Sequence, residues 1–297
     1  MKIALVKIGA LSAIVALFMT GQLACAQTTH KPVEEMLKGI KKAGGVCRPD
    51  GSSSTEESQT RNESPDFSCG IDAVSALSWT GQQGAVVVDT RTSGEFSGFH
   101  ANGALNLEVG ALRAKSYLRD KKLLLAGNGK TERELYIACA NLKKMGFKQV
   151  RLLRGGMPAW LLHSQPVVGQ PGSLAAQLRL TPSEMWAGSR FDANVVLLAP
   201  AMSVLQKDLP MALVLRDENT EAIKSQVEKR RRGSSSSVVL VGGPGWTDER
   251  IEQLAQKLKP LPLLVFAEKP EVYKQFLTTQ EAVWKARARG PKKLKCG

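Results

Sequence analysis

Short apolar runs alternate with amphipathic segments along most of this chain. Residues 85–88 and 122–126 are nearly continuous apolar runs, typical of strands buried on both faces of a parallel sheet, and residues 149–153 form a third strand pattern. Apolar residues at helical spacing follow the second run, where Thr131 and Glu134 have the spacing of a capping box. This order of strand, loop, helix and strand predicts an α/β fold with a parallel sheet flanked by helices.

The same order of signals returns in the second half of the chain. Apolar runs at 195–198, 238–241 and 261–266 alternate with helical segments. Laid side by side, the segments Leu-Leu-Leu-Ala-Gly-Asn-Gly and Leu-Val-Gly-Gly-Pro-Gly place Ala126 opposite Val241. Two copies of one unit, the second degenerate, are the simplest interpretation of this pattern.

The first residues have the pattern of a secretory signal. Lys2 and Lys7 form a short positive start before an apolar run over residues 8–19, and Ala-Cys-Ala at 24–26 has the small residues of a cleavage site. The run is too short for a comfortable transmembrane helix, so we expect a signal peptide at 1–26 and a periplasmic mature protein. The alternatives are an uncleaved anchor and a lipoprotein acylated at Cys25, although Gln22 stands where lipoprotein signals prefer Leu.

A mostly polar stretch separates this signal from the first α/β unit. Residues 30–43 have apolar residues at helical spacing, and residues 51–66 are rich in Ser, Thr, Glu and Asn. The sequence therefore predicts an N-terminal helix and a polar linker over 27–66. Cys47 and Cys69 bracket the polar part, and in the periplasm a disulfide between them would tie the helix to the body. The alternative is two thiols with unrelated partners.

Composition and charge narrow the classes of function. The chain of 297 residues has 41 Lys and Arg against 27 Asp and Glu, a net charge of +14 that suits nucleic acid or a membrane surface. No nucleic-acid motif accompanies this charge, and we expect no nucleic-acid partner. The basic residues concentrate at 229–232 and in a tail over 285–297. The tail is either solvated surface or a peripheral contact with anionic lipid, cell wall or an acidic partner.

Other catalytic and ligand motifs are weak. None of the three histidines lies near a second ligand in sequence, so we expect no metal and no cofactor. Gly129-Lys130-Thr131 resembles the end of a phosphate-binding P-loop, but Leu124 stands where that motif needs its first glycine. The loop can still hold a small anion on its amides, and its residues are Gly127, Asn128, Gly129, Lys130 and Thr131.

Several short motifs follow one another in a fixed order over residues 71–167. Val-Val-Asp-Thr-Arg at 87–91 is followed by Glu-Phe and then Gly-Phe-His-Ala-Asn-Gly-Ala over 95–104, and Gly-Gly-Met-Pro-Ala-Trp at 155–160 closes the set. Together these motifs resemble the rhodanese-like, or sulfurtransferase-fold, domain family. We expect their side chains mainly to preserve the scaffold; the residues are Asp89, Arg91, Glu95, His100, Gly103, Gly155, Gly156 and Trp160.

The resemblance predicts two tandem rhodanese-like domains, each a parallel sheet flanked by helices. The expected boundaries are a first domain at 67–168, a linker at 169–179, a degenerate second domain at 180–284 and the basic tail beyond it.

The resemblance also implies that this chain lacks the catalytic cysteine of the family. In the family, a cysteine at the end of the central strand accepts sulfur as a persulfide, and the pattern Cys-x-x-Gly maps onto residues 126–129. The position of the nucleophile is therefore Ala126, whose methyl group cannot carry sulfur. Cys139 lies more than three helical turns further on, and we expect it in the core. Cys296 has two candidate partners, Cys139 and another chain.

These observations predict an exported rhodanese-like protein that lacks its nucleophile and binds an envelope protein or a small anion. The alternative is a sulfurtransferase or thiol-disulfide enzyme that uses Cys47 or Cys69.

Overall fold

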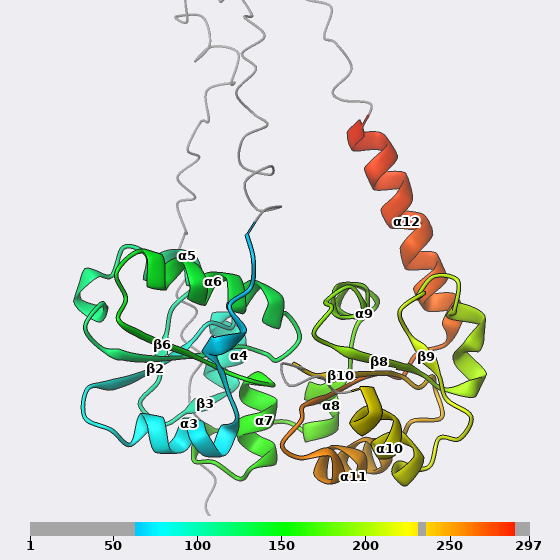
Figure 1. Ribbon diagram of the computed structural model, residues 1–297, viewed down its shortest axis with the longest axis horizontal. Coiled ribbons are helices and arrows are strands. Elements are labelled where there is room, and N and C mark those ends of the chain that lie inside the picture. The colour runs from blue at the N-terminus through cyan, green and yellow to red at the C-terminus, as the bar shows by residue number, and fades with distance from the viewer. Residues whose placement is uncertain (1–62, 231–235, 289–297) are drawn as a thin grey trace, which may run out of the picture. The chain divides into compact units, whose positions relative to one another are not determined.

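The structure is a computed structural model that describes residues 63–230 and 236–288 (Figure 1). The predicted signal peptide at 1–26, most of the predicted N-terminal helix and linker, and the end of the basic tail lie outside the described residues. Cys47 and Cys296 lie outside them as well. Within the described part of the chain, no helix is both long and apolar enough to cross a membrane.

The first sheet has five parallel strands in the order β1-β6-β5-β2-β4. The strands are β1 (Gly70–Ile71), β2 (Ala85–Asp89), β4 (Leu105–Asn106), β5 (Lys122–Ala126) and β6 (Gln149–Leu153). The helices around it are α3 (Ala73–Thr80), α4 (Ser93–Gly98), α5 (Val109–Leu112), α6 (Glu132–Lys144) and α7 (Gly156–Leu162). A small antiparallel pair joins β3 (Phe99–Ala101) to β7 (Val167–Gly169). The predicted α/β fold is thus confirmed for this part of the chain.

The second sheet has four parallel strands in the order β11-β10-β8-β9. The strands are β8 (Val195–Leu198), β9 (Leu213–Val214), β10 (Val238–Val241) and β11 (Leu263–Phe266). The helices are α8 (Leu174–Leu178), α9 (Pro182–Ser189), α10 (Thr220–Arg230), α11 (Asp248–Leu258) and α12 (Pro270–Ala288). Short 3₁₀ turns complete the described chain at η2 (Phe67–Cys69), η3 (Ser116–Leu118) and η4 (Pro200–Leu205).

The two sheets have the same strand order. In chain order, the strands β2, β4, β5 and β6 take the same places as β8, β9, β10 and β11. Even the edge strand β1 has a trace in the second sheet, because Arg179 forms a parallel bridge with Val265 and the Leu180 amide donates to the Val265 carbonyl at 2.8 Å. We call the two parts the first module (residues 63–169) and the second module (residues 174–288).

Both sheets are buried on both faces, which explains the apolar runs. Leu123 and Leu125 pack into the cluster on one face of the first sheet, while Leu124 and Ala126 pack into the cluster on the other. Alternate residues of β10 divide in the same way between the two clusters of the second sheet. Because successive side chains of a strand point to opposite faces, a strand covered by helices on both sides must be apolar throughout.

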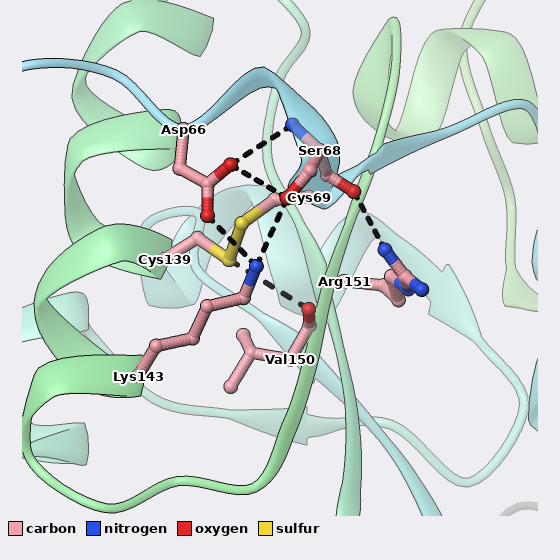
Figure 2. Close-up of a disulfide and its surroundings, with 7 residues drawn as sticks. All are labelled: Asp66, Ser68, Cys69, Cys139, Lys143, Val150 and Arg151. Atoms are coloured by element: carbon pink, nitrogen blue, oxygen red, sulfur yellow. Dashed lines mark hydrogen bonds and ion pairs between the residues drawn. A yellow bond between two sulfur atoms is a disulfide. The ribbon is translucent and has the colours of Figure 1, made fainter.

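The disulfide predicted between Cys47 and Cys69 is wrong. Cys69 is bonded to Cys139 instead, with 6.5 Å between the two Cα atoms, and both residues are fully buried (Figure 2). Cys139 lies on the face of α6 that packs against η2, a proximity that a sequence separation of 70 residues conceals. The expectation that Cys139 is a core residue is confirmed, but it is also a bridging one.

Polar contacts hold the same segment in place. Lys143 Nζ lies 2.8 Å from Asp66 Oδ2, and Arg151 donates to the Ser68 carbonyl at 2.6 Å (Figure 2). Hydrogen bonds from Lys143 and Ser68 lower the pKa of Asp66.

The predicted linker at 169–179 is not a bare connection. It contains α8, in which Ala175 is fully buried and Leu178 is 3% exposed, both within a core cluster of the second module. At the other end, α12 continues past the predicted boundary at 284 to Ala288.

Candidate functional site

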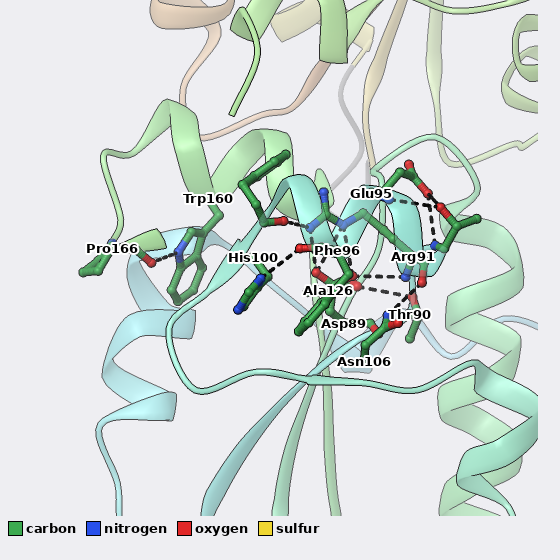
Figure 3. A network of polar contacts seen from close by, with 12 residues as sticks. Asp89, Thr90, Arg91, Glu95, Phe96, His100, Asn106, Ala126, Trp160 and Pro166 are labelled. Carbon is green, nitrogen blue, oxygen red and sulfur yellow. Dashed lines mark hydrogen bonds and ion pairs between the residues drawn. The ribbon is translucent and has the colours of Figure 1, made fainter. Parts of the chain in front are cut away.

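Ala126 lies at the carboxyl end of β5, in the centre of the first sheet. It pairs in register with Asp89 of β2, and its side chain is fully buried. Its carbonyl accepts hydrogen bonds from the Thr90 amide at 2.8 Å and the Thr90 hydroxyl at 3.2 Å (Figure 3). The central strand therefore ends in a buried methyl group at the place where the loop to α6 begins.

The loop after Ala126 is held from within. The Lys130 amide donates to Asn128 Oδ1 at 2.9 Å, and Gly129 has a φ of +78°, a backbone conformation that favours glycine. The turn from β6 into α7 presses on this loop so closely that a Cβ on Gly156 would collide with the Gly127 carbonyl. The glycine-rich loop thus has a defined shape, set by another glycine-rich turn.

Asp89 and Arg91 form a buried ion pair beside this loop (Figure 3). The guanidinium lies 2.7 Å from Asp89 Oδ2, donates to the Phe99 carbonyl at 2.6 Å and rests over the Phe99 ring at 4.4 Å. Asn106, which the sequence analysis did not select, donates to the carbonyls of both Asp89 and Arg91. No distinctive motif could have revealed Asn106, because its role depends on β4 lying next to β2.

The other motif residues also make local contacts. Glu95 completes a capping box with Thr92 at the start of α4. The His100 ring stacks on Phe96, with 3.9 Å between ring centroids, and its Nδ1 lies 2.9 Å from the Phe96 carbonyl. Trp160 Nε1 donates to the Pro166 carbonyl at 3.0 Å. Gly103 takes a φ of +71° and Gly155 one of +73°. These are contacts that shape turns and helix ends.

Two cavities have Lys130 in their linings. One, of about 340 Å³, is lined by residues that include Arg91, Glu95, Asn128 and Lys130. The other, of about 210 Å³, lies between the start of α6 and the second module and also includes Lys130. Lys130 Nζ is 3.3 Å from Glu184 Oε2 of α9, so part of its charge is already balanced. Within residues 63–230 and 236–288, no cluster of His, Cys, Asp or Glu could hold a metal.

Glu132, the first residue of α6, was not selected from the sequence. It is 4% exposed, and its carboxylate accepts hydrogen bonds from the Gly155 amide and the Ser236 hydroxyl. Burial raises the pKa of Glu132 to about 7, against the lowering effects of these two hydrogen bonds and of Arg154. In the sequence, Glu132 was indistinguishable from the acidic residues common in first helical turns.

The capping box predicted for Thr131 and Glu134 is wrong, because Thr131 makes no capping hydrogen bond. The backbone of Thr131 has a φ of −119° and a ψ of 45°, outside the extended geometry that places a cap side chain over the first amides. The start of α6 is therefore left without a side-chain cap.

The fold and the site together define an α/β module built on one parallel sheet. Residues 72–163 match the family model of the rhodanese-like domain, and this segment is a rhodanese-like domain. No curated protein matches the chain.

Solved structures resemble different lengths of the chain. The rhodanese-like domain of an Anabaena protein is 26% identical, with 34% of this chain and 79% of that chain covered and a TM-score of 0.30. Thiosulfate sulfurtransferase from Pseudomonas aeruginosa is 15% identical over 70% of this chain and 42% of its own, with a TM-score of 0.30. The 3-mercaptopyruvate sulfotransferase SseA from Escherichia coli is 12% identical over 68% and 98%, with a TM-score of 0.29.

Proposed function

We propose that this protein is an exported rhodanese-like protein that does not transfer sulfur and acts as a binding module in the cell envelope. The observation that carries the proposal is the methyl group of Ala126 at the end of β5. A rhodanese reaction needs a thiolate that takes sulfane sulfur as a persulfide and then passes it on, and a methyl group can do neither.

The other cysteines of the described chain do not replace the missing nucleophile. Within residues 63–230 and 236–288 the cysteines are Cys69 and Cys139, and the disulfide between them consumes both thiols. The alternative enzyme that would use Cys69 loses its nucleophile for this reason, while Cys47 lies outside the described residues. A buried structural disulfide also suits an oxidising compartment, which supports export to the periplasm.

The binding role is supported by what the module keeps. The loop over residues 127–131 retains its glycines and its lysine, and a cavity of about 340 Å³ remains beside it. The proposed partners are therefore a small anion or an envelope protein that reaches this edge of the sheet.

The test is a sulfur-transfer assay on the purified mature chain, with thiosulfate as donor and cyanide as acceptor. We compare the wild type with Ala126→Cys and with the matched control Ala126→Ser. The serine hydroxyl is similar in size to the cysteine thiol but cannot form a persulfide. We expect the wild type and Ala126→Ser to form thiocyanate at the same background rate. A wild-type rate far above that of Ala126→Ser would overturn the proposal, and a gain in Ala126→Cys alone would show that the rest of the site is intact.

A further inference from the structure

The C-terminal half of α12 extends beyond the core of the second module (Figure 1). The first half of this helix is firmly packed, because Tyr273 is fully buried in a core cluster and Phe276 and Leu277 pack against the same cluster. Residues 281–288 are all exposed. The last turns of α12, about two in number, thus continue a packed helix into solvent.

This exposed end of α12 has an apolar side. Val283 is 39% exposed and Trp284 is 46% exposed. Trp284 comes about two helical turns after Leu277, so it continues the side of the helix that packs into the core. Its ring centroid lies 5.7 Å from that of Trp186 in α9, which holds the indole in place while nearly half of the residue stays open to solvent. Within the described chain, this apolar surface is only partly covered.

Cations lie around the apolar side. Residues 281–297 include six Lys and Arg but a single acid, Glu281. Lys285 and Arg287 belong to the described part of α12, and both are exposed. Lys285 Nζ lies 2.6 Å from Glu281 Oε1, but such an exposed pair contributes little energy and leaves Lys285 able to change partners. This end of α12 therefore suits a partner that is anionic and also accepts an indole.

The charge and the shape of this surface favour one kind of partner. A second copy of the chain would bring the same cations together, and like charges repel. An acidic protein would need a pocket that matches a projecting helix end. The surface of an anionic bilayer needs no matching shape, and it satisfies both features. Indoles settle at the boundary between headgroups and acyl chains, while Lys and Arg bind the anionic headgroups.

We propose that the C-terminal half of α12, with the rest of the basic tail, attaches this protein to anionic lipid at a membrane surface. Trp284 and Val283 lie at the headgroup boundary, and Lys285 and Arg287 meet the lipid phosphates. The attachment is peripheral, because two apolar side chains and a set of cations bind a bilayer reversibly. This goes beyond the binding role proposed for the first module, since neither Ala126 nor the loop after β5 takes part.

The first test is cosedimentation of the full mature chain with phospholipid vesicles. One kind has equal parts of phosphatidylcholine and phosphatidylglycerol, and the other has phosphatidylcholine alone. We expect binding to the first kind only, and weaker binding as salt is added. Each cation at such a surface contributes about fivefold in affinity, so Lys285→Gln with Arg287→Gln should bind about fivefold to 25-fold more weakly. The matched control, Lys229→Gln with Arg230→Gln, removes the same charge at the end of α10 and should bind as the wild type does.

A second measurement locates Trp284 in the lipid. Vesicles of the same anionic composition with brominated acyl chains quench the fluorescence of indoles that reach the headgroup boundary. We expect them to quench part of the tryptophan fluorescence of the wild type, and we expect Trp284→Phe to lose that quenching. Trp79→Phe is the control and should keep it, because Trp79 lies in α3 of the first module.

Several outcomes would contradict the proposal. They are no binding to the anionic vesicles, equal binding to both kinds of vesicle, an equal loss in the two charge variants, and quenching that persists in Trp284→Phe. A chain that dimerises without lipid, and does so less in Trp284→Phe, would assign the surface to a second copy instead. None of these results depends on the sulfur-transfer assay, because residue 126 is the same in every chain compared.

Discussion

The loops that follow β5 and β10 occupy the same place in two sheets of the same strand order, yet they differ in what fills them. After β5, the loop contributes residues to the lining of two cavities, and its cation Lys130 lies 3.3 Å from Glu184 of α9. After β10, Trp246 is 2% exposed and lies so close to Gly242 that a Cβ there would collide with the indole. The Arg250 guanidinium lies over that ring, 3.8 Å from its centre.

This difference shows that two sheets with the same strand order can leave different amounts of space at the same edge. Parallel strands present their carboxyl ends, with the loops that follow, on a single edge where ligands bind in open α/β sheets. In the second module a large aromatic side chain occupies that space and contributes to the core. In the first module, the loop after Ala126 has a cavity of about 340 Å³ beside it.

The largest effect on stability is expected from removing the indole that fills the space at the loop after β10. Trp246→Ala removes a nearly fully buried indole and should lower the free energy of unfolding by about 3–5 kcal/mol. Guanidinium unfolding measures the loss. Trp284→Ala is the control, because Trp284 is 46% exposed and its loss should cost much less. Equal losses in the two variants would show that Trp246 does not close this loop.

The disulfide is a second difference between the two modules. Within the described chain it lies in the first module alone. The double variant Cys69→Ala with Cys139→Ala should lose about 4 kcal/mol, since the bond closes a loop of 70 residues. Denaturant unfolding of the variant and the wild type measures it. A non-reducing digest provides the control, and a peptide that joins Cys69 to Cys47 instead would contradict the structure.

A smaller effect on stability is expected from the acidic residues in the first turns of the helices that follow the two loops. Glu132 of α6 is buried, whereas Asp248 of α11 is half exposed and paired with Arg179 at 2.6 Å. The pKa of Glu132 rises from 4.5 to about 7 on folding, so the folded state holds this proton more tightly and stability falls as the pH rises through that interval. Above pH 7 the loss is about 3 kcal/mol.

Glu132→Gln should remove that pH dependence. The amide keeps an acceptor for the Gly155 amide, and the variant should be more stable than the wild type at pH 8 by up to about 3 kcal/mol, with little difference at pH 4. Thermal unfolding across this pH range measures the difference. Glu134→Gln, on the exposed face of the same turn, is the control and should follow the wild type. If the stability of Glu132→Gln depends on pH in the same way as that of the wild type, the buried carboxyl does not titrate near neutrality.

Much of the fold was predictable because it depends on local pattern. The runs at 85–88 and 238–241 are apolar throughout, and such runs become central parallel strands when helices cover both faces. The rhodanese-like motifs were equally visible, because Asp89 and Arg91 contact each other across a separation of only two residues. Contacts between residues this close in the chain can be inferred from the local sequence.

The site was less predictable because its contacts join distant segments. Glu132 meets Ser236 across 104 positions, and Lys130 meets Glu184 across 54. The error over Cys69 had the same origin, since a polar loop beside it suggested a local partner while its true partner lies on α6. No periodicity or motif reports which of two helices will pack against a given turn.

The sequence by itself determined the two α/β modules and the rhodanese-like domain at residues 72–163, because each depends on residue type and short spacing. The tertiary structure alone decided that Cys69 pairs with Cys139, that Glu132 is buried and that Ser237 and Trp186 line a cavity beside α6. Those facts follow from how packed elements exclude water and leave polar groups with or without partners, which is a property of the assembled fold.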